Sequence, residues 1–228
     1  RLEAMLEATT SALVAGHRKL AEKLFDDARF LFLRIVAESP NARLFNKMKR
    51  VARSFEDEQL LESLQYEYRS AVVARSNNHR ELREAGAYHQ GLQSALQQDP
   101  GRKRLQAVLS LSRDWRKHWG EESLKNEMLQ DHNPLFKAAS MYALASHTLR
   151  AEKNPEKALG YLDQAEGFAE GLDSSGEQQL LYKEIADEYE EIARKHDIDI
   201  AERALILGSK IQDWEESLTL QLTVIMGP

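Results

Sequence analysis

Apolar residues recur at intervals of three and four along most of the chain, which is the spacing of a helix face. The clearest faces cover residues 20–35, 60–72, 82–96, 105–119, 135–149, 158–168, 177–194, 200–207 and 214–225. No alternating run rich in Val, Ile and Thr is long enough to predict a strand. The pattern therefore predicts an all-α protein of about a dozen helices without a sheet, and short connections favour antiparallel neighbours.

Polar residues in front of several apolar faces indicate where helices begin. The signals are Ser54 with Asp57, Asn133 before Pro134, Asn154 before Pro155, Ser174 with Glu177, and Asp213 with Glu216. Gly120 is expected to end the helix that precedes it. No domain boundary is evident, so residues 1–228 are predicted to form a single domain with hinges near 99–101 and 132–134.

The C-terminal half carries a pattern of small and large residues that suits paired helices. One such set of positions is Ala158, Leu162 and Ala165, and another is Tyr182, Ile185, Ala186 and Tyr189; each set is called a repeat phrase below. Looser copies are Tyr142, Ala145, Ser146 and Leu149, then Ala201, Leu205 and Gly208, and residues 95–100 read like the closing phrase of a repeat. Small residues at such positions let two helices approach closely. The pattern resembles the tetratricopeptide repeat.

This resemblance implies an α-solenoid of antiparallel helix pairs whose concave surface holds another protein or peptide. It implies no catalytic residues, because the family shares none. The alternative is a compact all-α bundle in which the Ala and Leu spacing is ordinary core packing. The N-terminal part lacks regular repeats of about 34 residues.

Composition narrows the function classes. The net charge of -6 argues against a bulk nucleic-acid binder, although a local basic patch is compatible with it. The absence of cysteine excludes disulfides, zinc–thiolate sites and thiol catalysis. No apolar run approaches the roughly 20 residues of a membrane span, and the start at Arg1 is no signal peptide. A cytoplasmic location is the default expectation, for a chain that reads as a trimmed piece or a segment of something longer.

A locally basic segment stands out in this acidic chain. It contains Arg102, Lys103, Arg104, Arg113, Trp115, Arg116, Lys117, His118 and Trp119. A basic amphipathic helix with Trp suits a phosphate group, an acidic partner or a membrane surface. We therefore take Arg102, Arg104, Arg113, Arg116, Lys117 and Trp119 as candidate partner-binding residues. The alternative is a solvated outer face with the Trp rings buried against a neighbouring helix.

Two further groups bear on binding. The acidic residues Glu184, Asp187, Glu188, Glu190 and Glu191 form a counterpart that would pair with the basic segment inside the protein or in a neighbouring copy, unless they are a solvated face. Tyr66, Arg69 and Tyr88 are candidates to line a binding groove, together with Tyr68, His89 and Arg80. The alternative places these rings in the core between helices, since Tyr68 falls on an apolar face.

Short motifs for chemistry are missing from the sequence. The seven His residues are scattered without the spacing of a helical zinc site, and neither a phosphate-binding glycine loop nor a nucleophile elbow occurs. We expect no cofactor and no enzyme, although some all-α enzymes lack short motifs. The sequence thus favours a non-catalytic scaffold or regulatory module that binds another protein. The alternative is a nucleic-acid or phosphate-binding helical protein that uses residues 102–117. The final apolar helix, 214–225, predicts self-association as a further possibility.

Overall fold

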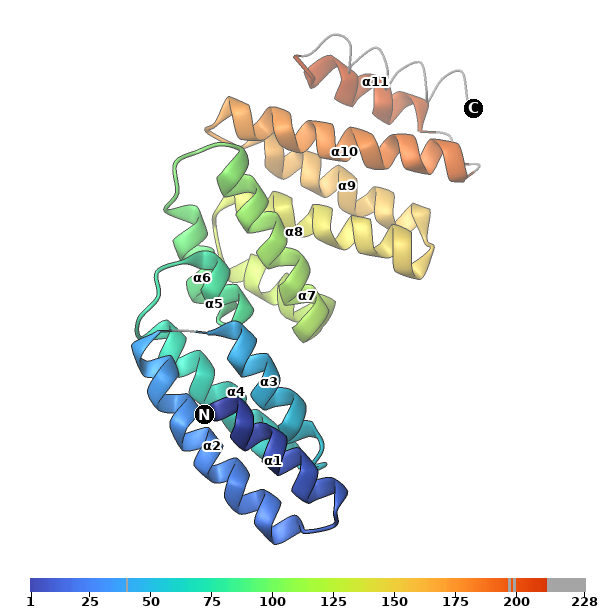
Figure 1. Cartoon of the computed structure of the whole chain (residues 1–228). Helices are drawn as coiled ribbons and strands as arrows, with labels where there is room; N and C mark the ends of the chain where they lie inside the picture. The colour runs from blue at the N-terminus through green and yellow to red at the C-terminus, as the bar shows by residue number, and fades with distance from the viewer. Residues whose placement is uncertain (40, 197, 199, 213–228) are drawn as a thin grey trace. The chain divides into compact units, whose positions relative to one another are not determined.

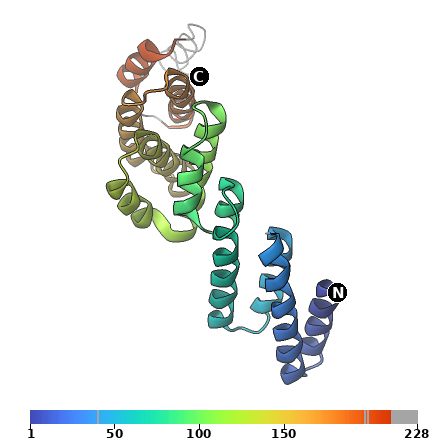
Figure 2. The ribbon, with the colours of Figure 1, turned by 90° about the vertical axis from the view of Figure 1, so that its left-hand side faces the viewer.

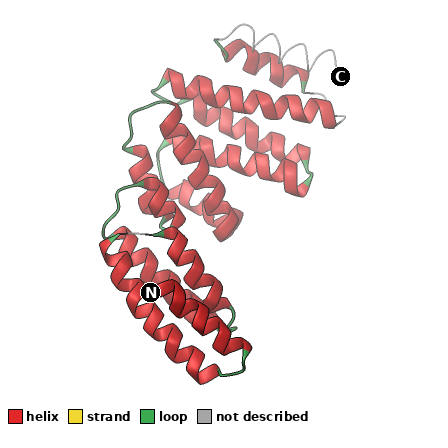
Figure 3. Ribbon diagram, in the orientation of Figure 1, coloured by secondary structure: helices red, strands yellow, loops and turns green. Residues whose placement is uncertain are grey.

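The computed structural model describes residues 1–39, 41–196, 198 and 200–212. These residues form eleven α-helices and one short π-helical segment, and no strand occurs among them (Figure 3). The prediction of an all-α protein is confirmed. The described chain divides into two compact units, Arg1–Ser94 (unit 1) and Ala95–Pro228 (unit 2), which are described separately.

Unit 1 is built mainly from four helices and completed by shorter ones. Its elements are α1 (Leu2–Val14), α2 (Arg18–Glu38), α3 (Ala42–Arg53), α4 (Glu58–Val73) and α5 (His79–Glu84), and α6 (Tyr88–Leu96) crosses the boundary between the units. Helices α1 and α2 lie side by side (Figure 2), α2 packs on α4, and α3 packs on α4. The pairs α1–α2 and α3–α4 are neighbours in sequence joined by short connections, whereas the α2–α4 contact brings together helices separated by α3.

An aromatic cluster fills the centre of unit 1. The rings of Phe45 and Tyr68 stack with 4.1 Å between centroids, and Phe32 lies 6.0 Å from Tyr68. Burial raises the pKa of Tyr68 to about 12. At the edge of this core, Arg29 Nε on α2 donates a 2.9 Å hydrogen bond to Glu67 on α4. Tyr68 is thus a core residue, as the alternative interpretation of its apolar face predicted.

Unit 2 is a succession of helices that pack on their neighbours in sequence. Its elements are α7 (Arg102–Gln130), α8 (Pro134–His147), the π-helical segment η1 (Thr148–Glu152), α9 (Pro155–Glu170), α10 (Ser175–Lys195) and α11 (Ala201–Lys210). Helix α8 packs on α7 and α9, and α10 packs on α9 and α11 (Figure 1). The small residues Ala158 and Ala165 are fully buried, as is Ile185, whereas Leu205 of the looser phrase at the C-terminal end is 45% exposed.

Most predicted helix starts are confirmed by side-chain caps. Asn133 accepts from Leu135 N, Asn154 from Lys157 N, and Ser174 from Glu177 N. The prediction for Ser54 is wrong, because Asp57 caps α4 by accepting from Leu60 N at 3.1 Å. Residues 54–56 form a turn in which Glu56 has a φ of 57°, so the helix begins only after it.

Gly120 interrupts α7 as the sequence predicts. Its φ of 86° and ψ of 172° lie outside the helical region and divide α7 into two helical segments. The predicted cap at Asp213 and the helix at 214–225, with the self-association assigned to it, lie outside the described residues.

Candidate functional site

The basic segment of α7 separates into exposed and engaged residues. Arg102, Lys103, Arg113 and Lys117 are exposed, whereas Arg104 and Arg116 are half-buried. At about 100° per residue, the four exposed cations fall on one stripe of the helix surface. None of the four forms an ion pair with a residue that the structure describes. We call these four residues the cationic stripe.

Arg104 is a structural residue. Its Nε lies 2.7 Å from Glu177 Oε1 and its Nη2 lies 2.5 Å from Glu177 Oε2, so the two side chains form a bidentate pair. Glu177 is fully buried, and it also accepts from the backbone N of Gly101 at 3.0 Å. The hydrogen bond to Glu177 raises the pKa of Arg104. This pair ties the start of α7 to the start of α10, at one of the predicted hinges.

Arg116 faces a second charged network. Partial burial lowers the pKa of Arg116, and the nearby Glu152 and Glu121 oppose this effect. Glu121 accepts from Lys125 Nζ at 2.6 Å and from the Tyr161 hydroxyl at 2.5 Å. Burial disfavours the Glu121 carboxylate, but these two hydrogen bonds and the charges of Lys125 and Lys157 together outweigh it and lower the pKa of Glu121 to about 2. The network joins the second segment of α7 to α9.

Arg113 rests on an aromatic ring from the next helix. Its guanidinium carbon lies 5.7 Å from the ring centroid of Tyr142 on α8, within the range of a cation–π interaction. The Tyr142 hydroxyl lies 3.1 Å from a carboxylate oxygen of Glu184 and 3.1 Å from one of Glu188, both on α10, so these two acceptors share its one proton. Burial raises the pKa of Tyr142, with Glu188 and Glu184 adding to the effect, so the hydroxyl keeps its proton across the physiological range.

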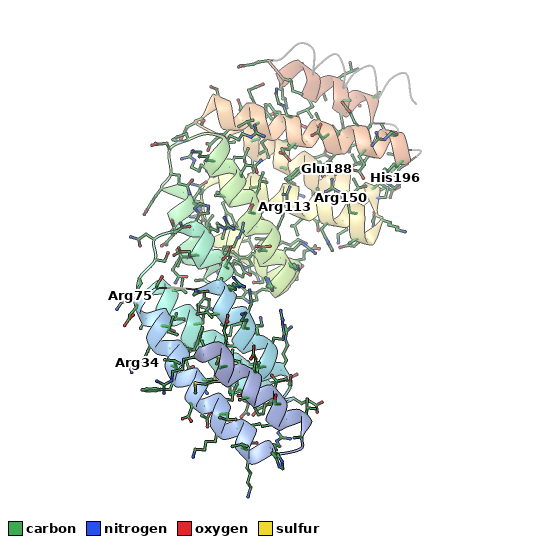
Figure 4. All side chains as sticks on the ribbon, viewed as in Figure 1. Arg34, Arg75, Arg113, Arg150, Glu188 and His196 are labelled. Carbon is green, nitrogen blue, oxygen red and sulfur yellow. The ribbon has the colours of Figure 1, made fainter. Side chains whose placement is uncertain are left out.

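Arg150 completes this arrangement from the π-helical segment η1. Its Nη2 lies 2.8 Å from Glu188 and 3.5 Å from Glu191. Glu188 is 1% exposed, and its Oε2 has no hydrogen-bond partner among the described residues. Figure 4 shows Arg113, Arg150 and Glu188 on neighbouring elements of unit 2. We call Arg113, Tyr142, Arg150, Glu184 and Glu188 the Tyr142 cluster.

The predicted pairing of the acidic run with the basic segment is indirect. Glu184 and Glu188 reach Arg113 only through the Tyr142 ring, and the direct ion pair to Glu188 comes from Arg150, outside the basic segment. Glu191 is shared between Arg150 and Lys195, the latter at 2.8 Å. Much of the acidic run is therefore engaged inside unit 2.

The two tryptophans of α7 have different environments. Trp115 is 2% exposed, packs 6.1 Å from Phe136, and donates from Nε1 to Ser123 Oγ at 3.2 Å. Trp119 is 46% exposed and meets the Trp115 ring edge-on at 5.6 Å. Burial against a neighbouring helix thus holds for Trp115, while Trp119 is partly exposed.

The structure does not gather the aromatic candidates of unit 1 on one surface. Tyr66 is 71% exposed on α4, whereas Tyr88 is 3% exposed at the start of α6. Arg69 lies beside Gly86, where a Cβ would stand 3.5 Å from its Nη2. The assignment of Tyr88 as a partner contact is corrected, because its ring belongs to the core. The expectation of a groove contact stays a prediction for Tyr66 and Arg69.

Two other classes of site were tested within the described residues. These residues contain no cluster of three or more His, Asp or Glu side chains placed to hold a metal ion. Likewise, none of the described helices has the length and hydropathy to cross a membrane.

Sequence reasoning missed Arg150 and did not single out Tyr142 or Glu188 as site residues. A signal was present: Arg150 follows Tyr142 by about two helical turns, and Glu184, Glu188 and Glu191 share the i, i+4, i+7 spacing of one helix face. What the sequence lacked was the pairing of these two faces. No model of a known protein family matches this chain, and neither a curated protein nor a solved structure matches it, so the candidate site rests on its own geometry.

Proposed function

We propose that this protein is a non-catalytic interaction module that holds a segment of another protein on the face formed by α7, α8 and α10. The observation that carries the proposal is the cationic stripe, in which four exposed cations have no ion-pair partner among the described residues. Unpaired cations gathered on one helix face, in a chain of net charge -6, favour an external anionic partner.

The Tyr142 cluster supports this proposal because it fixes one member of the stripe. Arg113 lies over a ring that is itself held by two carboxylates and, through Glu188, by Arg150. A guanidinium held in this way loses less side-chain entropy when it binds a partner. The surface is therefore preorganised at Arg113.

The architecture that suits this function is a short stack of helix pairs similar to tetratricopeptide repeats. In this arrangement α8 pairs with α9 and α10 pairs with α11. The burial of Ala158, Leu162 and Ala165 at helix contacts is consistent with it. In such stacks the first helices of successive pairs line the concave face. Here these would be α8 and α10, whose buried Tyr142 and Glu188 support Arg113 of the cationic stripe from below the surface.

Affinity capture from lysate tests the function. The bait is the whole chain, compared with Arg113→Glu/Lys117→Glu and with Lys19→Glu/Lys23→Glu, which changes net charge equally on the exposed face of α2. We expect discrete proteins that survive nuclease treatment, are lost with the first variant and are kept with the second. Identical recovery with all three baits would contradict the proposal.

The second candidate function is binding of nucleic acid or another phosphate-bearing molecule. It is favoured by the same stripe, because its four cations are exposed and the carboxylate at its edge, Asp114, is half-buried. This function predicts nuclease-sensitive recovery and an affinity that falls steeply with salt. Unchanged nucleic-acid affinity after reversal of Arg113 and Lys117 would rule it out. The cytoplasmic location and self-association through 214–225 stay predictions.

A further inference from the structure

We infer that the partner segment bound by the cationic stripe is an acidic peptide, rich in Asp and Glu and recognised through its carboxylates. This inference rests on the proposed interaction function and names the chemistry of its partner. Four features of unit 2 carry it: the spacing of the stripe, the state of Arg113, the acidic residues of α10, and the position of Trp119.

The stripe has two cationic ends with an uncharged middle. Arg102 and Lys103 lie at one end and Arg113 and Lys117 at the other, all within the straight segment of α7 before Gly120. At about 1.5 Å per residue the ends are roughly 15–22 Å apart. Gln106 and Ser110 occupy the surface between them. The complementary ligand therefore carries two anionic groups separated by roughly 15–22 Å, which is at most about four helical turns.

Arg113 has the properties of a carboxylate receptor. Its flat guanidinium lies over the Tyr142 ring, and no described residue accepts a hydrogen bond from it. Arginine presents a planar fork of donors that matches a carboxylate in bidentate geometry. The Tyr142 ring lies on one side of the guanidinium, and the N–H groups of the fork have no acceptor among the described residues. A lysine at this position would keep the charge but lose the fork.

The neighbouring helix disfavours a long polyanion. Helix α10, which supplies Glu184 and Glu188 to the Tyr142 cluster, also carries the exposed Asp187 and the half-buried Glu190 and Glu191. A nucleic-acid strand that extends beyond α7 would meet this negative charge. A short acidic segment that remains on α7 avoids it.

The stripe also lacks the stacking platform that single-stranded nucleic acids use. The exposed aromatic residue of α7, Trp119, follows Lys117 by two positions and therefore points about 200° around the helix from it. Bases bound along the stripe would not reach this ring. Carboxylate recognition by charge and hydrogen bonding is the chemistry that remains.

Fluorescence anisotropy with defined probes tests the inference on the whole chain. The first probe is a labelled peptide with two Glu clusters joined by a Gln and Ser spacer of about eight residues. The second replaces every Glu with Gln, and the third is an oligo-dT of equal length. We expect the Glu peptide to bind more tightly than both other probes, with affinity that falls as salt rises from about 50 to 200 mM.

Charge-reversal variants locate the binding. Arg113→Glu/Lys117→Glu and Arg102→Glu/Lys103→Glu should each weaken the Glu peptide about tenfold or more, while Lys19→Glu/Lys23→Glu leaves it unchanged. Arg113→Lys should weaken binding by less than the reversal but measurably, because the charge is kept and the fork is lost. Circular dichroism confirms that each variant remains helical.

Several outcomes would overturn the inference. These are equal binding of the Gln peptide, tighter binding of oligo-dT, no detectable peptide binding, and loss of binding in the Lys19 and Lys23 control. If the Glu peptide does not bind while lysate capture still depends on Arg113 and Lys117, the proposed interaction function is retained and the inferred acidic partner is rejected. If capture also does not depend on these residues, both proposals are rejected.

Discussion

The guanidinium of Arg113 lies over the ring of Tyr142, with 5.7 Å between Arg113 Cζ and the ring centroid. This contact joins an exposed cation of α7 to a buried phenol of α8. The phenol is in turn held by Glu184 and Glu188 of α10, so three helices of unit 2 meet at one side chain. Tyr142 therefore both packs in the core of unit 2 and supports the exposed Arg113.

Tyr142→Phe should lower the free energy of unfolding by about 1–2 kcal/mol, because Glu184 and Glu188 lose their shared donor while the ring remains. Tyr142→Ala should cost more, about 3–5 kcal/mol, since it also opens a cavity. Urea unfolding measures both. Tyr66→Phe serves as the control, because Tyr66 is 71% exposed and its change should be negligible. An equal loss for Tyr142→Phe and Tyr66→Phe would contradict this account.

Glu177→Ala should destabilise the fold by about 3–5 kcal/mol, because it leaves Arg104 and the Gly101 N–H without their shared acceptor. Arg104→Ala should also destabilise, since it strands the fully buried Glu177. A double-mutant cycle on denaturant unfolding is expected to give a coupling of about 1.5–3 kcal/mol. The neighbouring Arg102→Ala, which is exposed, should stay within about 0.5 kcal/mol. Additive effects of the two substitutions would show that the pair does not stabilise the fold.

Stability should fall in acid partly through Glu121. The folded pKa of Glu121 is lowered from 4.5 to about 2, so its contribution is complete above the unfolded value and is lost as pH falls from about 5 to 2. After discount for solvent screening, this contribution is about 1–2 kcal/mol. Glu121→Gln should therefore lower the free energy of unfolding at pH 7 and converge with the wild type near pH 2.

Chemical denaturation across this pH range measures the difference. Glu122→Gln is the matched control, because the Glu122 side chain is 83% exposed and makes only a 3.5 Å contact with Lys125. A constant difference between Glu121→Gln and wild type at all pH values would exclude the titration of Glu121 as its cause.

Substitution of Ala for two glycines of unit 2 should change the free energy of unfolding in opposite directions. Gly120 has a φ of 86°, so Gly120→Ala is expected to cost about 1–2 kcal/mol through backbone strain alone, as no atom would crowd its Cβ within 4 Å. Gly160 lies inside α9 with equally open space, so Gly160→Ala should stabilise by about 0.5–1 kcal/mol. Thermal or urea unfolding decides both. Stabilisation by Gly120→Ala would show that the break in α7 is not maintained by the backbone of Gly120.

Local sequence signals predicted most of the secondary structure. Asn133, Asn154 and Ser174 cap their helices as expected, because a cap depends on residues within one turn of it. The exception is instructive: Ser54 has the right residue type, but Asp57 takes its role after a turn through Glu56. Asp57 lies three residues after Ser54, and the turn over residues 54–56 places the helix start at Asp57.

The candidate site was predicted less completely. The basic segment was visible in the sequence, but its division into the exposed Arg113 and the engaged Arg104 was not, because Glu177 lies 73 residues beyond Arg104. Tyr142 and Glu188 are likewise 46 residues apart. Single-chain periodicity identifies which residues share a helix face, and it carries no information on which faces meet.

The sequence by itself determined the all-α class, most helix starts, the break at Gly120, and the presence of a basic face on an acidic chain. These features arise from hydrogen bonds and side-chain spacing within a few residues. The tertiary structure decided which cations are paired, that Tyr88 is buried while Tyr66 is exposed, and that Arg113 rests on Tyr142. The physical reason is that pairing and burial depend on the close packing of helices that are distant in sequence. A buried carboxylate such as Glu177 forms its ion pair with whichever cation this packing places beside it, here Arg104.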